Sequence, residues 1–381
     1  MATNNVIILG AGLVGRPMAL DLLKNDEFEV GIADFSASAL KNFENTKAKT
    51  FQLDLTNSEN VAKVISPYDL VINAVPGFMG YNCLKAVIEA GKNVVDIAFY
   101  PEDPFTLDRL AKKNKVCVIC DMGVAPGMSH LLSGYAASKL EKINKILIYV
   151  GGLPKVRTLP WEYKAVFSPS DVIEEYTRPA RLIENGKIVY KEALSEPELI
   201  EFEHIGTLEA FNSDGLRSLV YTLKADYMAE KTLRYLGHID KIKTLKTSGF
   251  LDTNAIQING IDISPLEFTK KILFSSWKLA EKEEDITVMR IIVEGIDIHG
   301  VQKRFTYNLH DTYHNETNIH SMARTTGYSA TAALRLLNDD IYHKIGVNVP
   351  EFIGKDEKSV LFILDKLRER GIHYQEQIID L

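Results

Sequence analysis

The chain has 381 residues, which predicts two domains at the usual size of about 150 residues per domain. Lysine and arginine number 44 against 51 aspartate and glutamate residues, and the resulting net charge of −7 excludes the basic surface that nucleic acid or an anionic membrane would require. Hydrophobic residues make up 46% and charged residues 25%, proportions typical of a globular protein and not of a disordered or fibrous one.

Membrane insertion and secretion are not expected. No apolar stretch approaches about 18 residues, the length that spans a bilayer. Residues 1–5 are polar and lead straight into a strand-like run, so they lack the basic and apolar regions of a signal peptide. The three cysteines, Cys83, Cys117 and Cys120, cannot all pair, which favours a reducing cytoplasm.

Two groups of possible ligands are rejected as metal sites. Cys117 and Cys120 have C-x-x-C spacing, but they lie in a predicted strand, where residues three apart point to opposite faces. His310 and His314 share the polar face of another predicted strand, with His320 beyond it, and a zinc site there needs more ligands than we can place. We therefore predict no metal centre.

The first third of the chain alternates short apolar runs with helical stretches such as 15–24 and 81–91. This βαβ rhythm predicts a doubly wound parallel sheet of the Rossmann type. The runs are almost continuously apolar, as expected for strands whose two faces are both covered by helices. The predicted strands are 6–10, 30–34, 50–54, 69–75, 93–98 and 116–121.

A second, mixed α/β domain is predicted at 126–320, where it would bind substrate and form a dimer interface. Longer alternating strands at 286–294 and 301–313, joined by a turn at 297–300, indicate an antiparallel hairpin. Residues 233–238 look strand-like. A helix is predicted to begin at Ser168-Pro169, with the serine as cap and the proline in the first helical position.

Two amphipathic helices are predicted in the last part of the chain, near 321–340 and 357–370. Leu334, Leu337 and Ile341 fall at helical spacing there. No strand is predicted in this part, so we expect the helices to return to the first domain. The Rossmann domain is therefore predicted to comprise 1–125 and 321–381.

A dinucleotide fingerprint lies between the first predicted strand and the first predicted helix. Its sequence is Gly10-Ala11-Gly12-Leu13-Val14-Gly15. Gly10 allows the tight turn, Gly12 allows the backbone to approach a pyrophosphate, and Gly15 allows helix and strand to pack closely. The helix N-terminus is then available to the phosphates.

Asp34, at the end of the next predicted strand, favours NAD over NADP. Its carboxylate would accept hydrogen bonds from the ribose hydroxyls and would repel a 2′-phosphate. Residues 35–38, Phe-Ser-Ala-Ser, supply no arginine or lysine to offset that repulsion. The alternative is a capping or surface role for Asp34.

Further candidates lie at the carboxyl ends of the predicted strands, where ligands bind in open α/β sheets. Asp96 and Asp121 would face the crevice that holds the nicotinamide, and burial there would raise the pKa of a carboxyl toward the working range of a base. The alternative is that each of them caps a loop or a helix. The residues expected along the adenine and pyrophosphate-ribose path are Asp54, Leu55, Ala74, Val75 and Pro76.

Four further motifs carry a family resemblance. They are the stretch DMGVAPGM at 121–128, YVGGLP at 149–154, LRYLGH at 233–238 and MARTTGY at 322–328. With the fingerprint, they make the chain resemble the saccharopine dehydrogenase-like family over essentially its whole length. In length and motif order the chain is most similar to the lysine 6-dehydrogenases, and Ala125-Pro126-Gly127 stands where saccharopine reductases tend to carry D-P-G.

This resemblance implies a pyridine-nucleotide-linked oxidation at a carbon that bears nitrogen. It also implies that Asp96, Tyr100 and Asp121 border the reaction centre and that 206–219 supplies an arginine for the substrate. Arg217 is our candidate, because a guanidinium can hold a carboxylate bidentately. A surface salt bridge is its alternative role.

His238 and Arg234 are four residues apart in the strand-like run, so we expect them on one face with Thr232 and Leu236. Either residue would line the substrate pocket or only an interface. His238 is also the next candidate for the base.

The expected function is NAD-dependent oxidative deamination of the ε-amine of L-lysine. One alternative is a saccharopine- or carboxynorspermidine-type reductase that acts on a secondary amine. A second is a non-catalytic NAD-binding protein. We expect a small amine or amino acid as substrate, a homodimer or higher homo-oligomer, and a cytoplasmic location.

Overall fold

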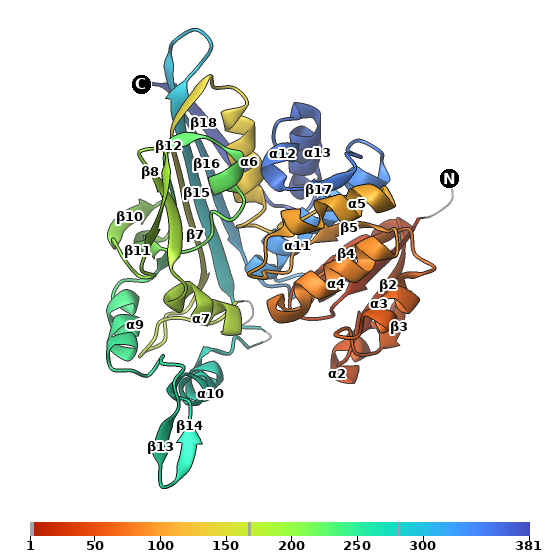
Figure 1. Cartoon of the computed structure of the whole chain (residues 1–381), viewed down its shortest axis with the longest axis horizontal. Helices are drawn as coiled ribbons and strands as arrows, with labels where there is room; N and C mark the ends of the chain where they lie inside the picture. Colours follow the sequence, from red (N-terminus) through yellow and green to blue (C-terminus); the bar gives the residue numbers. More distant parts are fainter. Residues whose placement is uncertain (1–3, 167–168, 281) are drawn as a thin grey trace. The chain divides into compact units, whose positions relative to one another are not determined.

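The computed structural model describes residues 4–166, 169–280 and 282–381. Its chain divides into two compact units. The first comprises Met1–Leu140 and Ala323–Tyr374, and the second comprises Glu141–Met322 and Gln375–Leu381. Each unit is described separately (Figure 1).

The first unit contains a seven-stranded parallel sheet with the order β17-β6-β5-β4-β1-β2-β3. The prediction of a doubly wound Rossmann sheet with six strands near the N-terminus is confirmed. The central strands are fully buried, as their continuous apolar runs predict. The strands are β1 (Asn5–Leu9), β2 (Glu29–Asp34), β3 (Lys49–Gln52), β4 (Leu70–Asn73), β5 (Asn93–Asp96), β6 (Cys117–Ile119) and β17 (Gly346–Asn348).

Strand β17 corrects the prediction that the last part of the chain contributes helices alone. It pairs in parallel with β6, with Gly346 opposite Cys117. Another strand, β18 (Tyr374–Asp380), adds to the sheet of the second unit. The sequence signal for β17 is weak because only three residues pair.

Helices pack against this sheet, and Figure 1 shows α4 and α5 alongside its strands. Both predicted C-terminal helices are present, as α11 and α13, although Ile341 lies beyond the end of α11. The helices are α1 (Gly15–Leu22), α2 (Ala37–Leu40), α3 (Ser58–Ile65), α4 (Gly77–Glu89), α5 (Asp108–Asn114), α6 (Met128–Ala137), α11 (Ser321–Asn338), α12 (Pro350–Ile353) and α13 (Glu357–Arg368).

Helix α6 places the first boundary between the units at 140/141, where the sequence predicts 125/126. It packs against α12 and α13. At Gly134 a Cβ atom would lie 2.4 Å from the carbonyl oxygen of Glu351, so the two backbones approach more closely than any other residue would allow.

A buried ion network fixes the C-terminal helices to α1. The Asp21 carboxylate accepts hydrogen bonds from Arg335 Nη1 at 2.8 Å, Arg370 Nε at 2.7 Å and Thr331 Oγ1 at 2.7 Å. Burial alone would raise the pKa of Asp21, but Arg335 and Arg370 hold it below its usual value. The network confirms that this part of the chain returns to the first unit.

The second unit contains a nine-stranded mixed sheet. Its main order is β10-β11-β12-β7-β15-β16-β18, and β8 pairs with both β12 and β9. The predicted hairpin is confirmed, because β15 and β16 pair antiparallel around a turn at Asp297. The strands are β7 (Lys142–Pro154), β8 (Ala180–Glu184), β9 (Lys187–Lys191), β10 (Glu198–Phe202), β11 (Gly206–Asn212), β12 (Ala225–Arg234), β15 (Asp285–Ile296), β16 (Gln302–Thr312) and β18.

Four helices and a small hairpin complete the described part of this unit. Pro169 is the first residue of α7, as predicted, whereas its predicted cap Ser168 lies outside the described residues. None of the helices in the described ranges is long and apolar enough to cross a membrane. These elements are α7 (Pro169–Thr177), α8 (Leu219–Thr222), α9 (His238–Thr247), α10 (Pro265–Trp277), β13 (Ile256–Ile258) and β14 (Ile261–Ile263).

The prediction that 233–238 is one strand is wrong. Strand β12 ends at Arg234, and His238 is the first residue of α9. The chain turns at Gly237, whose φ of +84° belongs to the left-handed region that glycine adopts without strain. Leu236 is therefore exposed, while Thr232 and Arg234 are buried.

Candidate active site

The fingerprint loop of the first unit has the geometry of a dinucleotide site. Gly10 has φ +108°, and a Cβ there would lie 2.5 Å from the carbonyl oxygen of Ala74. A Cβ on Gly15 would lie 2.0 Å from the carbonyl oxygen of Gly10. At Gly12, by contrast, no described protein atom lies within 4 Å of the Cβ position. The open space beside Gly12, before the N-terminus of α1, fits the pyrophosphate of a dinucleotide.

Asp34 ends β2 beside this loop. Its Oδ2 accepts a hydrogen bond from the Ala11 amide at 2.7 Å, and its Oδ1 accepts one from the Ser36 amide at 2.8 Å. Each carboxylate oxygen can accept a further bond, so the ribose hydroxyls can still be accommodated. These contacts also supply the capping role that is the alternative for Asp34.

The other predicted cofactor residues differ in exposure, and their contact with a cofactor stays a prediction. Asp54 is exposed and accepts bonds from the amide and the hydroxyl of Thr56, which lower its pKa. The remaining exposed or half-buried positions are Leu13, Val14, Ala74 and Pro76, and the buried ones are Leu55 and Val75.

Asp96 ends β5 and is completely buried. Its Oδ1 accepts bonds from Asn73 Nδ2 at 2.9 Å and the Ala98 amide at 3.0 Å, and its Oδ2 accepts one from the Tyr100 hydroxyl at 2.9 Å. Burial raises the pKa of Asp96 to about 7, and the negative charge of Asp121 contributes to that rise against the effect of the hydrogen bonds. A carboxyl with this pKa can exchange a proton near neutral pH.

Asp121 follows β6 and takes a rarely used backbone conformation. Its φ is +54°, and it is buried. Among the described residues other than glycine, the buried ones with positive φ are Asp121, Leu194 and Arg217. Buried side chains in strained backbone are concentrated at functional sites, which supports Asp121 and Arg217, the two of these residues that the sequence analysis names as candidates.

Tyr100 is a hydrogen-bond donor to the carboxyl of Asp96. Its hydroxyl is buried, and burial and then Asp96 raise the pKa of Tyr100 well above its usual value. The hydroxyl therefore keeps its proton and can donate the hydrogen bond to Asp96. The Cys120 sulfur lies 3.8 Å from the same hydroxyl. Sequence reasoning missed Asn73, although an asparagine that ends the apolar run of β4 was a usable signal.

In the second unit, Arg217 lies in the loop between β11 and α8. It is buried, with only 5% of its surface exposed, and its φ is +46°. Next to it, Asp214 forms a bidentate pair with Arg181 at 2.7 and 2.9 Å. Arg217 is therefore held inside a constrained loop and not at the surface.

A second buried carboxyl, Glu230, lies in the middle of β12 and was not predicted. Its Oε2 accepts a hydrogen bond from Ser213 Oγ at 2.8 Å, and it also accepts the Gly215 amide. Burial raises the pKa of Glu230 to about 8, and Glu175 and Asp214 add to that effect. A glutamate within a strand gives no motif that sequence reasoning could have used.

His238 and Arg234 meet through a third residue, Tyr176. Arg234 Nε donates to the Tyr176 hydroxyl at 3.1 Å, and that hydroxyl lies 3.0 Å from His238 Nε2. His238 Nδ1 lies 3.1 Å from the Trp161 carbonyl oxygen. Burial, and then Arg234, lowers the pKa of His238 to about 3, so the ring is neutral and donates through Nδ1. Both ring nitrogens therefore have partners within the unit.

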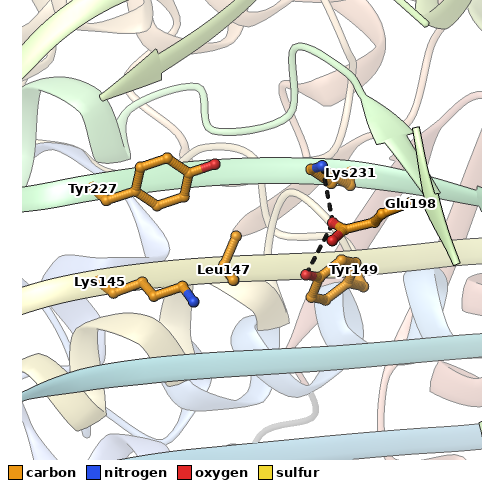
Figure 2. Close-up of a pocket in the computed structure, with 6 residues that line it drawn as sticks. All are labelled: Lys145, Leu147, Tyr149, Glu198, Tyr227 and Lys231. Carbon is orange, nitrogen blue, oxygen red and sulfur yellow. Dashed lines mark hydrogen bonds and ion pairs between the residues drawn. The ribbon is translucent and has the colours of Figure 1, made fainter. Parts of the chain in front are cut away.

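The face of the nine-stranded sheet opposite to Glu230 carries an open pocket of about 390 Å³ (Figure 2). Lys231 points to this face because adjacent strand residues alternate, whereas Glu230 points to the other. Glu198 bridges Lys231 Nζ at 2.9 Å and the Tyr149 hydroxyl at 3.1 Å. The lining residues are Lys145, Leu147, Tyr149, Glu198, Tyr227 and Lys231.

The sequence predicts no metal centre, and the placement of possible metal ligands bears on that prediction. Within the described ranges, no group of three or more histidine, cysteine, aspartate or glutamate residues is placed to hold a metal ion. The three cysteines are buried, and none of them forms a disulfide bond in the part of the chain that the structure describes. Cys117 lies near Asn348, while Cys120 lies near Tyr100, so the two thiols have different surroundings.

Comparison with known families assigns the chain. Residues 6–119 match the description "Saccharopine dehydrogenase NADP binding domain", and residues 123–372 match "Saccharopine dehydrogenase C-terminal domain". The chain belongs to the saccharopine dehydrogenase family. The predicted resemblance is therefore confirmed at the level of the family.

Individual relatives extend over nearly the whole chain. A saccharopine dehydrogenase (NADP⁺, L-glutamate-forming) of Schizosaccharomyces pombe is 25% identical and covers 99% of both chains. A carboxyaminopropylagmatine dehydrogenase of Synechocystis is 22% identical and covers 98% of this chain and 97% of its own. The solved saccharopine dehydrogenase of Saccharomyces cerevisiae, 20% identical over 99% of this chain and 100% of its own, has the same fold with a TM-score of 0.83.

These findings establish the class of the protein. It is an oxidoreductase of the saccharopine dehydrogenase type that acts on a carbon–nitrogen bond and uses a pyridine nucleotide. The names of the relatives give no support to a non-catalytic role. Several of them specify NADP, so the choice of NAD is argued separately below.

Proposed function

We propose that this member of the family catalyses the NAD-dependent oxidative deamination of the ε-amine of L-lysine. The observation that carries the proposal is Asp96, a completely buried carboxyl at a strand end whose pKa is raised to about 7. A base of this strength suits the removal of a proton from an amine.

A pyridine nucleotide held by the loop of Gly10, Gly12 and Gly15 would supply the acceptor for the hydride of the ε-carbon. Asp96 takes a proton from the ε-nitrogen of the substrate, directly or through a water molecule. Before this step Asp96 is ionised, and Tyr100 donates a hydrogen bond to its carboxylate. Asp121 adds negative charge beside it and is the second candidate for the base. Water then hydrolyses the imine to the aldehyde and releases ammonia.

The choice of NAD rests on Asp34. A 2′-phosphate near this carboxylate would meet a like charge, and residues 35–38 include no cation that could offset it. The two backbone amides that the carboxylate binds keep it in place beside the fingerprint loop. We infer that this chain departs from its NADP-specific relatives at this position.

Substrate binding is assigned to the loop of Arg217. A guanidinium can hold the α-carboxylate of lysine by two parallel hydrogen bonds, which leaves the ε-carbon as the end that is oxidised. Tyr100 and His238 were predicted to contact the substrate as well. Their bonds to Asp96 and to Tyr176 favour a supporting role for both side chains.

A second candidate function is a saccharopine dehydrogenase activity on a secondary amine, which the names of the relatives favour. A carboxynorspermidine-type reductase would act on the same kind of bond. Such substrates carry a second charged arm, so a second carboxylate-binding residue would be needed beside Arg217.

We also propose a homodimer formed through the face of the second sheet that carries the pocket in Figure 2. Ile292 of β15 lies opposite Leu147 of β7, which extends the apolar part of this face. Lys145 and Glu294 add charges of both signs, as a two-fold interface requires. Light scattering should give the mass of a dimer, and the change Leu147→Asp should give a monomer.

The activity is tested by following the absorbance of the reduced cofactor with lysine, cadaverine, saccharopine and other amino acids. Lysine should be oxidised fastest with NAD. Lysine deuterated at the ε-carbon should transfer deuterium to the cofactor, as read by mass spectrometry. Unlabelled NADH formed at a normal rate would place the reaction at the α-carbon and contradict the proposal, and a preference for saccharopine would favour the second candidate.

A further inference from the structure

The loop Ser213–Arg217 is bound at two points by one buried carboxyl group that the proposed reaction does not use. Glu230 lies in the middle of β12, with 4% of its surface exposed. Its Oε2 accepts the Ser213 hydroxyl at 2.8 Å, and its carboxyl also accepts the Gly215 amide. The loop is thus tied to the strand at two points, two and four residues before Arg217.

Two further contacts restrict the same loop. Ser213 Oγ also lies 2.7 Å from Thr232 Oγ1 on β12. The Asp214 carboxylate accepts hydrogen bonds from Arg181 Nε at 2.7 Å, from Arg181 Nη2 at 2.9 Å and from the Arg181 amide at 3.2 Å. Three consecutive residues of the loop therefore have fixed partners.

The approach of the loop to Glu230 depends on a glycine. A Cβ atom at Gly215 would lie 2.3 Å from Glu230 Oε2, far inside van der Waals contact. Any other residue would force the loop backbone or the Glu230 carboxyl to move out of this contact. The loop is consequently shaped around the Glu230 side chain, and not merely placed near it.

Arg217 is held in a conformation that it does not prefer. Its φ of +46° lies in the left-handed region, which a residue with a side chain rarely adopts and which persists only where the surroundings determine it. The side chain of Ser213 and the amide of Gly215 bond to β12, and the Ser213 amide also donates to the Glu230 carbonyl oxygen at 3.2 Å.

We propose that Glu230 is a positioning residue for substrate recognition: by anchoring Ser213 and Gly215, it sets the backbone of Arg217 and so the grip of the guanidinium on the substrate carboxylate. The inference rests on the proposed role of Arg217. It does not depend on the identity of the base.

The ionisation of Glu230 gives the inference a distinctive readout. Burial raises its pKa to about 8, with Glu175 of α7 and Asp214 of the loop adding to the rise and Ser213 and Gly215 opposing it. Above pH 8 the carboxylate accepts both loop donors, whereas below pH 8 one oxygen carries a proton. A glutamine resembles the protonated form, so Glu230→Gln should matter more at pH 9 than at pH 7.

The experiment compares steady-state kinetics of Glu230→Gln and the wild-type enzyme with lysine and with cadaverine, which lacks the carboxylate. At pH 9 the KM for lysine should rise about tenfold, with kcat within twofold and the KM for cadaverine unchanged. At pH 7 the ratio of the two lysine KM values should fall to about threefold or less. Glu201→Gln, which changes an exposed carboxylate of the same sheet, is the matched control and should behave as wild type.

Two further variants separate this inference from the function on which it rests. Ser213→Ala removes one anchor from the loop side and should raise the KM for lysine in the same way, without adding fully to Glu230→Gln. In an Arg217→Ala background, Glu230→Gln should have no further effect on that KM. If Arg217→Ala itself leaves the KM for lysine unchanged, the proposed role of Arg217 fails.

If Arg217→Ala raises the KM but Glu230→Gln lowers kcat alone, or adds fully to Arg217→Ala, the positioning role of Glu230 is overturned. A Glu230→Gln protein that does not fold leaves the test to Ser213→Ala, which keeps the carboxyl in place. A KM for lysine unchanged in Ser213→Ala would then overturn the inference.

Discussion

The two units bury their carboxyl groups in different settings. In the first unit Asp96 ends a parallel strand, at the edge of the sheet where ligands bind in this class of fold, and its partners come from the neighbouring strand and the residues that follow. In the second unit Glu230 lies in the middle of β12, and its partners come from a loop that crosses over it.

This difference shows that two buried carboxyl groups with similar pKa values can have different roles. The pKa is raised to about 7 at Asp96 and to about 8 at Glu230, in both cases mainly by burial. In the function we propose, Asp96 exchanges a proton with the substrate amine, whereas Glu230 shapes a loop. Variants of the first unit should therefore change turnover and cofactor choice, and variants of the second should change the KM for the amino acid.

The largest expected effect is on turnover, from Asp96→Asn. The asparagine keeps the shape but cannot accept the proton, so kcat should fall by about 10² to 10⁴ with little change in the affinity for NADH. Stopped-flow kinetics and fluorescence titration of NADH would measure the two quantities. Full turnover in both Asp96→Asn and Asp121→Asn would show that these aspartates are structural.

The pH profile sharpens the same comparison. A base works as the carboxylate, so kcat/KM should rise as the pH passes the raised pKa of about 7 at Asp96. The substrate amine, which loses its proton near pH 10.4 in the free amino acid, should extend the rise to alkaline pH. The limb near pH 7 should be absent in Asp96→Asn, and a limb that persists in this variant would contradict the assignment of Asp96 as the base.

A stability effect of about 3–5 kcal/mol is expected from Asp21→Asn in the first unit, since it leaves Arg335 and Arg370 buried beside a neutral partner. Denaturant unfolding would measure it. Because the pKa of Asp21 is lowered in the folded state, its contribution is present above pH 4 and is lost as the pH falls through the folded value. Asp26→Asn, at an exposed surface pair, is the control and should change stability by less than about 1 kcal/mol.

A smaller effect, on KM, is expected from Arg217 in the second unit. Loss of a bidentate bond to the carboxylate should cost about 1.5–3 kcal/mol and raise the KM for lysine far more than that for cadaverine. Arg217→Lys should be nearly as damaging as Arg217→Ala, because an ammonium cannot reproduce the planar fork. Equal effects on lysine and cadaverine would break the assignment of recognition to the second unit.

The smallest effect is expected when Asp34 is replaced, and it is a change in the preference for NAD over NADP. One like-charge repulsion is worth about 1–3 kcal/mol, so the wild type should prefer NAD by roughly ten- to hundredfold, and Asp34→Arg should narrow or reverse the preference. The ratio of kcat/KM values for the two cofactors measures it. Equal efficiency with NAD and NADP in the wild type would contradict this assignment.

The first unit was largely predictable because its signals are local. Apolar runs mark most of the strands β1 to β6, although β3 is largely polar and exposed. The glycines of the fingerprint have steric reasons that the structure bears out at Gly10 and Gly15. Asp96 could be found because it is a charged residue at the carboxyl end of an apolar run, where ligands bind in open α/β sheets. Strand β17 could not, because three residues carry no period and its pairing with β6 is a tertiary effect.

The second unit was less predictable because its polar groups are positioned by contacts distant in sequence. Glu230 is explained only by the loop that crosses it, and Arg234 only by Tyr176. The turn at Gly237 was misread, since the apolar and aromatic residues around it have a strand-like composition. The antiparallel hairpin, whose alternation is local, was predicted correctly.

The path of the chain between the units has a consequence for biosynthesis. The chain passes from one unit to the other after residues 140, 322 and 374. During synthesis Asp21 is made 314 residues before Arg335, a delay of roughly 15–60 s at about 5–20 residues per second. The unit that emerges first from the ribosome is therefore completed late: its buried aspartate waits for both arginines, and its sheet waits for an edge strand, until nearly the whole message has been translated.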